Sequence, residues 1–403
     1  MKVAEAVGGA LAAVDVGRVF GVVGSGNFHV TNAMIEAGSR FVAARHEGGA
    51  ATMADAYARM SGTLAALSVH QGCGLTNAMT GIAEAAKSRT PLLVLAAEAA
   101  EPRSNFYVDQ EALARSVGAV PARITSAETA VAETCAAAAT ALRGRRTVLL
   151  NLPLQLQALD APTDPAPAVL PEPPAPVEPS QSDLAALVDA LERAERPVFV
   201  AGRGARGEGC REALEALAER YGALVATSAV ARGLFHGSPW SLDVSGGFSS
   251  PAAAGLIRGA DLVVGWGCAL NMWTMRHGRL IAPDATVVQV DDDASALGAH
   301  LAIHLGVTGD VRVTARQAWA TAGEQRQGYR EADVGAEIAA RVRWRDVSYP
   351  DTGTTERIDP RTLSIGLDDI LPTERVLAVD SGNFMGYPSM FLSVPDENGF
   401  CFT

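Results

Sequence analysis

Glu47 is the residue whose setting most clearly suggests chemistry, because its carboxylate stands between an apolar segment and a run of small residues. Burying a carboxylate is costly unless a hydrogen-bond partner stabilises it, so this setting points to a ligand. Ser25 and His70 each follow another apolar segment, and open α/β sheets bind ligands where their strands end. A single loop histidine is more often a surface residue, but convergence of Ser25, Glu47 and His70 on one edge would form a site.

The first 160 residues alternate apolar segments of strand length with helical segments, which predicts a parallel sheet covered by helices on both faces. The expected strands are 18–23, 41–44, 64–69, 92–96 and 147–150, and the expected helices include 47–60 and one that begins near Thr76. Asn27 is placed to cap a helix after the first strand. The fold class that follows is a doubly wound α/β domain over residues 1–160.

Beyond residue 160 the chain divides into a linker, a second α/β unit and the start of a third. Proline-rich composition predicts an extended linker over 161–181. A Rossmann-like domain is expected over 182–343, with strands at 197–201, 223–226, 262–265 and 286–290. A polar linker, 344–357, leads to a third α/β domain that starts at 358 and has about 45 residues, too few to bury a core of its own. We therefore expect either a truncated chain or a second polypeptide that completes this domain.

The composition argues against several classes of function. The chain has 403 residues, a net charge of −12 and no basic patch, so nucleic acid is not an expected partner. None of the five cysteines lies in a Cys-x-x-Cys pair, which argues against a zinc site or a disulfide framework. No apolar run reaches the roughly 18 residues of a membrane span, and the N-terminus lacks the pattern of a signal peptide. We expect a soluble cytoplasmic protein that has no membrane partner.

Two motifs in the second unit have a functional and a structural interpretation. Gly202–Gly207 fits Gly-x-Gly-x-x-Gly, but a nicotinamide site needs an acidic residue at the end of the next strand, which here ends in Ala226–Ser228. A tight turn is therefore favoured over dinucleotide binding. Asp291–Asp293 could bind Mg²⁺. Three acids after a strand are more often turn formers and caps, so no residue of the chain is expected to be a metal ligand.

Several segments together resemble the thiamine-diphosphate-dependent enzymes of the acetolactate synthase, benzoylformate decarboxylase and pyruvate decarboxylase group. The matching segments in the first domain are Phe20–Ser25, Arg45–Ala51, Asp55–Arg59, Gly72–Asn77, Asp109–Glu111 and Asn151–Pro153. The region from Arg196 to Asp310 is similar to the central domain of the family, and Val379–Asn383 is similar to the opening of its third domain. The resemblance covers essentially the whole chain and implies a pyrimidine-binding first domain and a diphosphate-binding third domain.

The resemblance gives Glu47 a role. In that family its counterpart hydrogen-bonds N1′ of the cofactor's aminopyrimidine and favours the imino tautomer, which removes the proton from C2 of the thiazolium ring. The resulting ylid attacks the carbonyl of a 2-oxo acid, and decarboxylation or carboligation proceeds through an enamine. The further residues that the resemblance assigns to cofactor binding are Gly24, Gly72, Thr76, Asn77, Gly382 and Asn383.

The substrate is not fixed by the resemblance. Gln110 is similar in position to the active-site glutamine near the substrate carbonyl. His70 departs from the acetolactate synthase pattern, which has a small hydroxyl residue there, and Ser25 with His70 is closer to the benzoylformate decarboxylase arrangement. Cys73 replaces a usual proline. An acetolactate synthase-like reaction and a benzoylformate decarboxylase-like decarboxylation therefore stay open as alternatives.

The sequence also lacks part of the family pattern. The family binds the diphosphate and Mg²⁺ through Gly-Asp-Gly and Asn-Asn motifs, and neither occurs in these residues. The alternative of another class is therefore a catalytically inert binding or regulatory subunit. FAD is possible but not favoured, since the segment Gly265–Asn271 does not decide it. Relatives build each site between subunits, which implies a homodimer or homotetramer, or a second subunit that supplies the diphosphate-binding half.

Overall fold

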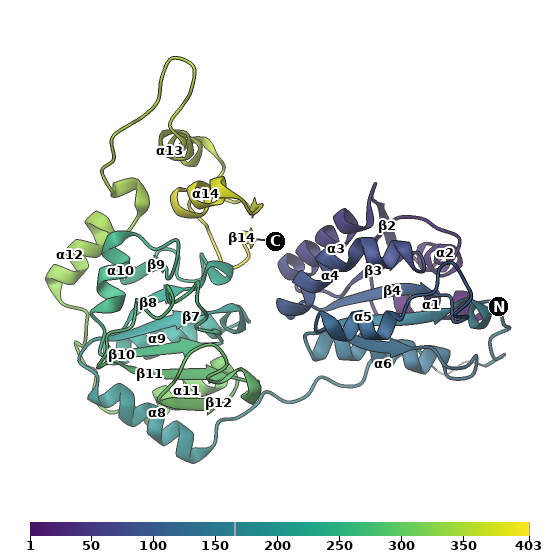
Figure 1. Ribbon diagram of the computed structural model, residues 1–403. Helices are drawn as coiled ribbons and strands as arrows, with labels where there is room; N and C mark the ends of the chain where they lie inside the picture. The colour runs from purple at the N-terminus through teal and green to yellow at the C-terminus, as the bar shows by residue number, and fades with distance from the viewer. Residues whose placement is uncertain (165–166, 403) are drawn as a thin grey trace. The chain divides into compact units, whose positions relative to one another are not determined.

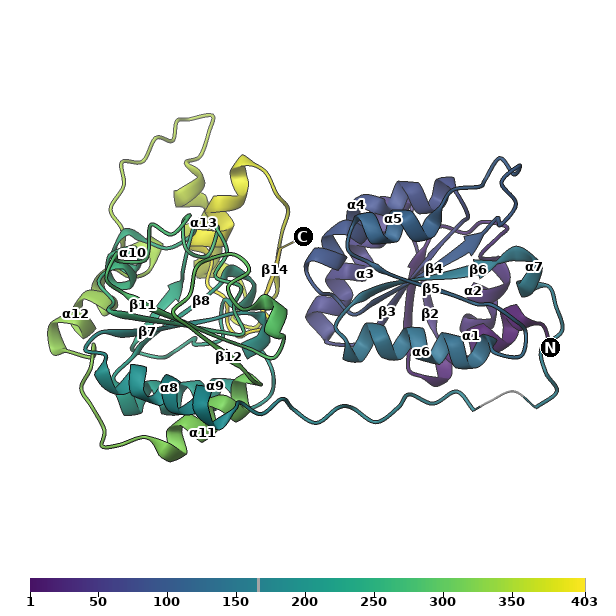
Figure 2. The ribbon, with the colours of Figure 1, turned by 60° about the horizontal axis from the view of Figure 1, so that its bottom comes forward.

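The computed structural model describes residues 1–164 and 167–402, which form two compact units, Met1–Pro174 and Ala175–Phe402 (Figure 1). Each unit contains a six-stranded sheet whose paired strands are all parallel. Helices cover both faces of each sheet (Figure 2). The doubly wound α/β class predicted from the sequence is confirmed.

The sheet of the first unit has the strand order β2-β1-β3-β4-β6-β5. Its strands are β1 (Arg18–Gly21), β2 (Arg40–Ala43), β3 (Ala65–Val69), β4 (Leu92–Glu98), β5 (Val120–Arg123) and β6 (Thr147–Pro153). One face is covered by α1 (Val3–Ala13), α2 (Phe28–Glu36) and α6 (Ala130–Arg143), and the other by α3 (Glu47–Ser61), α4 (Cys73–Lys87) and α5 (Gln110–Ser116). A short helix, α7 (Leu154–Gln157), follows β6. Strands β3, β4 and β6 are buried along their whole length, and most of their residues are apolar, as is typical of strands covered on both faces.

The sheet of the second unit has the order β12-β11-β10-β7-β8-β9. Its strands are β7 (Pro197–Ala201), β8 (Leu224–Thr227), β9 (Ser241–Val244), β10 (Leu262–Trp266), β11 (Thr286–Asp291) and β12 (Leu305–Thr308). Helices α8 (Gln181–Arg193), α9 (Cys210–Tyr221) and α11 (Val311–Thr321) cover one face, while α10 (Pro251–Arg258) and α12 (Ala332–Arg341) cover the other. Strands β5, β9 and β12 are absent from the sequence-based expectation because they are short and only partly apolar.

The C-terminal residues pack against the loop that follows β8, where Ala229 and Gly233 lie. They form α13 (Pro360–Ile370), β13 (Leu377–Val379), α14 (Gly386–Phe391) and β14 (Phe400–Phe402), and the two strands pair in parallel around a small apolar core. Arg232, which is 4% exposed, joins this segment to the central sheet. Its guanidinium binds both carboxylate oxygens of Asp243, at 2.9 and 2.7 Å, and donates to the carbonyl oxygen of Ser389 at 2.6 Å.

The glycine motif Gly202–Gly207 and the acidic motif Asp291–Asp293 of the second unit both form backbone turns. The N–H groups of Gly202 and Gly204 donate to the carbonyl oxygens of Trp266 and Gly267, at 2.8 and 3.0 Å. A Cβ atom on Gly202 would lie 2.3 Å from that Gly267 oxygen, so glycine is needed for the two loops to meet. Asp293 caps a helical turn by accepting from the N–H of Ser295 at 2.9 Å. Both observations agree with the structural interpretation of these motifs.

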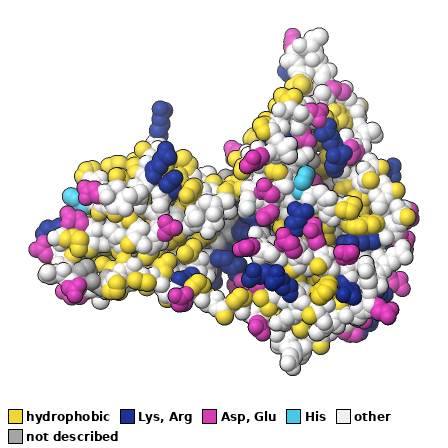
Figure 3. All heavy atoms as spheres, turned by 180° about the vertical axis from the view of Figure 1, so that it is seen from behind, with side chains coloured by type: hydrophobic (Ala, Val, Ile, Leu, Met, Phe, Trp, Pro, Cys, Tyr) yellow, Lys and Arg dark blue, Asp and Glu magenta, His cyan; other side chains and the backbone are white. Residues whose placement is uncertain are grey.

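The surface of the described residues mixes charged and apolar side chains. On the face shown in Figure 3, acidic and basic side chains are interspersed. No helix in the described part of the chain has the length and apolar character needed to cross a membrane. Exposed apolar side chains gather on the C-terminal segment: Ile358, Leu363, Leu367, Ile370, Leu371, Val376 and Phe384.

Asp368 is the polar centre of the C-terminal segment. Its carboxylate, 4% exposed, accepts from the backbone N–H and the hydroxyl of Ser393 at 2.8 and 2.7 Å. It also forms ion pairs with Arg345 and Arg375. Burial alone would raise the pKa of Asp368, but the hydrogen bonds from Ser393 and the charge of Arg375 outweigh it and lower the pKa below its ordinary value. The ionised carboxylate therefore stabilises this segment.

Replacing Asp368 by alanine should lower the free energy of unfolding of the second unit by about 2–3 kcal/mol, because the partly buried Arg375 and Arg345 lose the counter-charge of a carboxylate that is itself buried. Urea denaturation followed by tryptophan fluorescence measures the change. The matched control is Asp369→Ala, which removes a carboxylate that is 54% exposed and bonded to Arg345; its expected effect is below about 1 kcal/mol.

The same contact gives a pH dependence. Because the folded-state pKa of Asp368 is lowered, the stabilisation is present above the unfolded-state pKa of about 3.9 and is lost as the pH falls through the folded value. The difference between the native protein and Asp368→Ala should thus shrink below about pH 4. Equal losses for the Asp368 and Asp369 variants at neutral pH would contradict this account.

Candidate active site

The strand order locates a ligand-binding edge in the first unit. From β1 the chain passes to β2 on one side and then to β3 on the other. Helix α2, which follows β1, packs with α1, whereas α3, which follows β2, packs with α4 on the opposite face (Figure 2). The loops after β1 and β3 therefore separate at the carboxyl edge, where open α/β sheets bind ligands. These loops carry Ser25 and His70, as the sequence predicts.

Helices α3 and α4 approach each other closely through small residues. A Cβ atom on Gly81 of α4 would lie only 2.5 Å from the Cβ atom of Ala51 on α3. Ala50, Ala51 and Ala54 are fully buried on this side. The run of small residues after Glu47 is thus explained by helix packing, and it brings the first turns of α3 and α4 together.

A buried ion pair fixes the same two helices further along. Asp55 is 1% exposed and accepts from Nε of Arg59 at 2.8 Å and from the hydroxyl of Thr90 at 2.6 Å. Arg59 also binds Glu84 of α4 at 3.0 Å. Burial would lower the pKa of Arg59, but the hydrogen bond and charge of Asp55 outweigh it and raise the pKa above its ordinary value. The Asp55–Arg59 segment therefore connects α3 to α4 and to Thr90, just before β4.

Glu47 begins α3 and is half-buried at the carboxyl edge. Its Oε2 atom accepts a hydrogen bond from Nδ2 of Asn77, in the second turn of α4, at 3.1 Å. Its Oε1 atom has no hydrogen-bond partner among the described residues and faces Gly74, where a Cβ atom would lie 3.5 Å away. One carboxylate oxygen is thus held, and the other stands beside a residue without a side chain.

Ser25 and His70 form a second pair at the same edge. Nδ1 of His70 lies 2.9 Å from the carbonyl oxygen of Gln71, and a carbonyl oxygen can only accept, so this nitrogen carries the proton. Nε2 of the neutral ring is therefore an acceptor, and it lies 3.3 Å from the Ser25 hydroxyl. The pair can pass a proton between the serine oxygen and the imidazole.

Gly74 connects the two pairs. A Cβ atom at this position would lie 2.9 Å from Cβ of His70 as well as 3.5 Å from Oε1 of Glu47. Gly74 is not among the site residues predicted from the sequence, although the glycine spacing of the loop, Gly72 and Gly74, contains the signal. Glycine here lets the imidazole and the carboxylate share one small region.

Gly24 and Gly72, the two glycines of the first unit that the sequence predicts in the site, make room for protein groups. A Cβ atom on Gly24 would lie 2.5 Å from Cδ2 of His70, and one on Gly72 would lie 2.6 Å from the carbonyl oxygen of Phe106. Gly72 has φ +63°, a conformation that favours glycine. The Phe106 ring, which is 44% exposed, meets the His70 ring edge-on at 5.2 Å between centroids. An aromatic side chain therefore borders the imidazole.

Gln110 lies further along the sheet edge than the Glu47 and His70 groups. It is 2% exposed, and its Nε2 donates to Oδ1 of Asn151 at 2.7 Å. The structure records no contact from Gln110 to Ser25, Glu47 or His70 in the described part of the chain, so its proposed place near the substrate carbonyl stays a prediction.

An ion pair that sequence reasoning missed lies at this same end of the sheet. Glu98 closes β4 and is 7% exposed, and its Oε2 lies 3.0 Å from the guanidinium of Arg123 at the end of β5. Burial raises the pKa of Glu98 against the opposing charge of Arg123. In the sequence neither residue stands in a recognisable motif, so only the pairing of β4 and β5 with β6 brings them together.

The remaining predicted residues are placed as follows. The Thr76 hydroxyl donates to the carbonyl oxygen of Cys73 within α4, at 3.1 Å. Gly382 and Asn383 belong to the second unit, where Asn383 is exposed. Within residues 1–164 and 167–402, no group of three or more His, Cys, Asp or Glu side chains could hold a metal ion.

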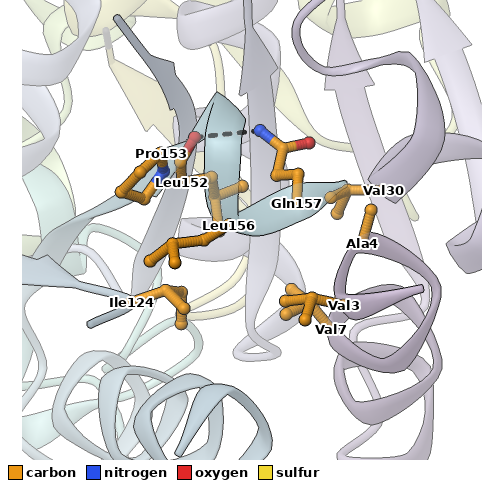
Figure 4. Close-up of a pocket in the computed structure, with 9 residues that line it drawn as sticks. All are labelled: Val3, Ala4, Val7, Val30, Ile124, Leu152, Pro153, Leu156 and Gln157. Atoms are coloured by element: carbon orange, nitrogen blue, oxygen red, sulfur yellow. Dashed lines mark hydrogen bonds between the residues drawn. The ribbon is translucent and has the colours of Figure 1, made fainter. Parts of the chain in front are cut away.

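Figure 4 shows a crevice in the first unit that is separate from these residues. Its lining is apolar apart from Gln157: Val3, Ala4, Val7, Val30, Ile124, Leu152, Pro153 and Leu156. Nε2 of Gln157 donates to the carbonyl oxygen of Leu152 at 2.9 Å. Because no titratable or nucleophilic side chain lines this crevice, it offers no chemistry.

Comparison with known families defines the class of protein. Residues 1–117 match the family model described as "Thiamine pyrophosphate enzyme, N-terminal TPP binding domain". Residues 184–318 match "Thiamine pyrophosphate enzyme, central domain". The two matches together span more than half of the chain. The chain belongs to the family of thiamine-diphosphate-dependent enzymes, and the resemblance found in the sequence is confirmed.

Curated relatives of the chain have several activities. A sulfoacetaldehyde acetyltransferase of Rhodobacter capsulatus is 29% identical over 90% of this chain and 65% of its own length. A probable 2-ketoarginine decarboxylase of Pseudomonas aeruginosa is 31% identical over 75% of this chain and 55% of its own. A putative acetolactate synthase large subunit of Mycobacterium tuberculosis is 30% identical over 68% of this chain and 52% of its own. The chain thus spans between about half and two thirds of the length of these relatives.

The residues around Glu47 fit the aminopyrimidine of the cofactor that this family binds. Asn77 holds one carboxylate oxygen, and Gly74 leaves the side of the other oxygen open, where a side chain would fill the space. A ring nitrogen that needs an acceptor or a proton can approach this oxygen. Glu47 would therefore hold the pyrimidine of thiamine diphosphate in this unit, with Asn77 fixing the carboxylate.

The contact between α3 and α4 can be tested by substitution. Gly81→Ala should lower the free energy of unfolding of the first unit by roughly 1–3 kcal/mol, because the new methyl group overlaps Ala51. Adding Ala51→Gly should recover part of the loss. In the matched control, Gly49→Ala, nothing lies within 4 Å of the new Cβ atom, and stability should be unchanged or slightly higher. Thermal unfolding monitored by circular dichroism measures all three; a neutral Gly81→Ala would contradict the packing account.

Proposed function

We propose that the protein is a thiamine-diphosphate-dependent enzyme that decarboxylates or ligates 2-oxo acids, with an acetolactate synthase-like reaction as the main candidate. The observation that supports this most strongly is Glu47, with one oxygen held by Asn77 and the other open beside Gly74. Bound thiamine diphosphate would supply a carbon nucleophile and an electron sink for the carbonyl substrate.

The residues of this chain have distinct parts in that chemistry. Glu47 would hold the pyrimidine ring nitrogen and could give or take a proton there, and Asn77 orients the carboxylate for it. Ser25 and His70 act on the substrate side, where the acceptor Nε2 and the serine hydroxyl can hold or move a proton at the substrate oxygen or carboxylate. Phe106 borders the imidazole with its ring edge-on to the His70 ring.

The Ser25–His70 pair also favours a second candidate, non-oxidative decarboxylation of the benzoylformate decarboxylase type. Release of an aldehyde requires a proton donor beside the former carbonyl carbon, and a serine–imidazole pair can relay one. Carboligation needs a second carbonyl substrate instead. The two reactions therefore differ in what they demand of His70.

Cofactor and partner proposals follow from the family. Mg²⁺ and the diphosphate are proposed to bind to residues other than those of the Glu47 site, and FAD is not favoured. A homodimer or homotetramer, or a second subunit that supplies the diphosphate-binding half, is proposed because relatives build the site between subunits.

Glu47→Gln should lower turnover of pyruvate by roughly 10²-fold or more, since the amide cannot exchange the proton with the ring nitrogen. The measurement is steady-state kinetics on the full gene product with thiamine diphosphate and Mg²⁺. Glu36→Gln, at an exposed carboxylate that ends α2, is the matched control and should leave turnover unchanged. A Glu47→Gln enzyme with native turnover would refute the proposed role, and failure of the full gene product to bind thiamine diphosphate in calorimetry would favour the inert subunit.

His70→Ala should separate the two candidate reactions. If the pair protonates the product carbon, aldehyde release from benzoylformate or pyruvate falls by roughly 10²-fold, while the share of ligated product rises. Chromatographic product analysis measures the ratio, and His29→Ala, at an exposed histidine of α2, is the control. An unchanged product ratio would assign the pair no part in product protonation.

A further inference from the structure

Gln71 has a buried side-chain amide for which the described residues supply no hydrogen-bond partner. It follows His70 in the loop between β3 and α4, and the residue is 4% exposed. Its Oε1 atom is fully enclosed and has no hydrogen-bond partner, and Nε2 makes no hydrogen bond within the described residues either. Leaving a buried carbonyl oxygen without a donor destabilises the folded state, so the amide requires an explanation.

Other buried glutamines in the described part of the chain are paired, which makes Gln71 the exception. Gln110 donates to Asn151 at 2.7 Å, and Gln157 donates to the carbonyl oxygen of Leu152 at 2.9 Å. Gln289 donates to the carbonyl oxygens of Cys268 and Ala296 and accepts from the N–H of Gly298. The fold therefore gives each of these three buried amides a hydrogen-bond partner.

The position of Gln71 associates it with the Ser25–His70 pair. A Cβ atom on Gly26, the residue after Ser25, would lie 1.9 Å from Oε1 of Gln71 and 2.8 Å from Cβ of Ala97 at the end of β4. The amide thus lies under the loop that carries Ser25. The backbone carbonyl oxygen of Gln71 accepts a hydrogen bond from Nδ1 of His70. The same residue therefore also sets the imidazole tautomer.

We propose that Gln71 is a substrate-binding residue whose Nε2 group donates a hydrogen bond to the carboxylate of a 2-oxo acid bound beside Ser25 and His70. This inference rests on the proposed function. A carboxylate is the part of such a substrate that accepts hydrogen bonds most strongly. In this arrangement the Nε2 group of Gln71 is held at the site, and Oε1 is left without a hydrogen-bond donor. The unpaired oxygen lowers stability locally, which is a cost that binding sites commonly retain.

The test compares Gln71→Met with Gln110→Met, because both remove a buried amide and keep a similar volume. Gln71→Met should raise the melting temperature of the protein by about 2–4 °C, since an unpaired polar group is removed. Gln110→Met should lower it, because Asn151 loses its partner. The dissociation constants for pyruvate and benzoylformate, measured by ligand-detected NMR on the full gene product, should rise roughly 10-fold in Gln71→Met.

The outcomes separate this inference from the proposed function. If the native protein binds the two acids and Gln71→Met binds them equally well, Gln71 has no part in binding, while the 2-oxo acid proposal stands. If the native protein binds neither acid, both proposals fail. A Gln71→Met protein that unfolds at a lower temperature, or does not fold, shows that the amide is structural and overturns the inference.

Discussion

The close packing of α3 on α4 is the constraint on which the site depends. Gly81 lets α4 approach Ala51 to van der Waals contact, and the buried Asp55–Arg59 pair joins the two helices to Thr90. Because both helices begin at the carboxyl edge of the sheet, this contact sets the distance between their first turns. The hydrogen bond from Asn77 to Glu47 follows from that distance. A larger side chain between the helices would separate the carboxylate from the amide that holds it.

The second half of the site, Ser25 and His70, depends on the strand order. From β1 the chain passes to β2 on one side and then to β3 on the other. This reversal opens the edge where Ser25 and His70 lie, and Gly74 lets the imidazole and the Glu47 carboxylate share that edge. The two halves differ chemically. One is a carboxylate that Asn77 holds, and the other is a serine hydroxyl beside an imidazole. In the proposed function the first would bind the cofactor and the second would act on the substrate.

Sequence reasoning predicted the repeating pattern of the fold but not its details. The strands 64–69 and 197–201 and the helix 47–60 correspond closely to β3, β7 and α3, because apolar period and small-residue composition are local properties. Helix α4 begins at Cys73, before the predicted Thr76, because Gly72 at φ +63° makes the turn that lets Leu75 N–H bond to the His70 carbonyl oxygen. Asn27 does not cap α2; its amide bonds to Ser68 of β3, a partner that only sheet packing supplies.

By itself, the sequence determined the α/β class and the family, since these rest on residue type and spacing within short segments. It also predicted Glu47, Ser25 and His70 as site residues, and that assignment stays a prediction. Tertiary structure alone decided which residues complete the site. Asn77 meets Glu47 across thirty positions of sequence, and the Nδ1 tautomer of His70 depends on the fold of the loop at Gln71. The unpaired amide of Gln71 and the pairing of Gln110 with Asn151 were also invisible in the sequence. Hydrogen bonds between distant residues depend on packing distances, and no local pattern encodes those distances.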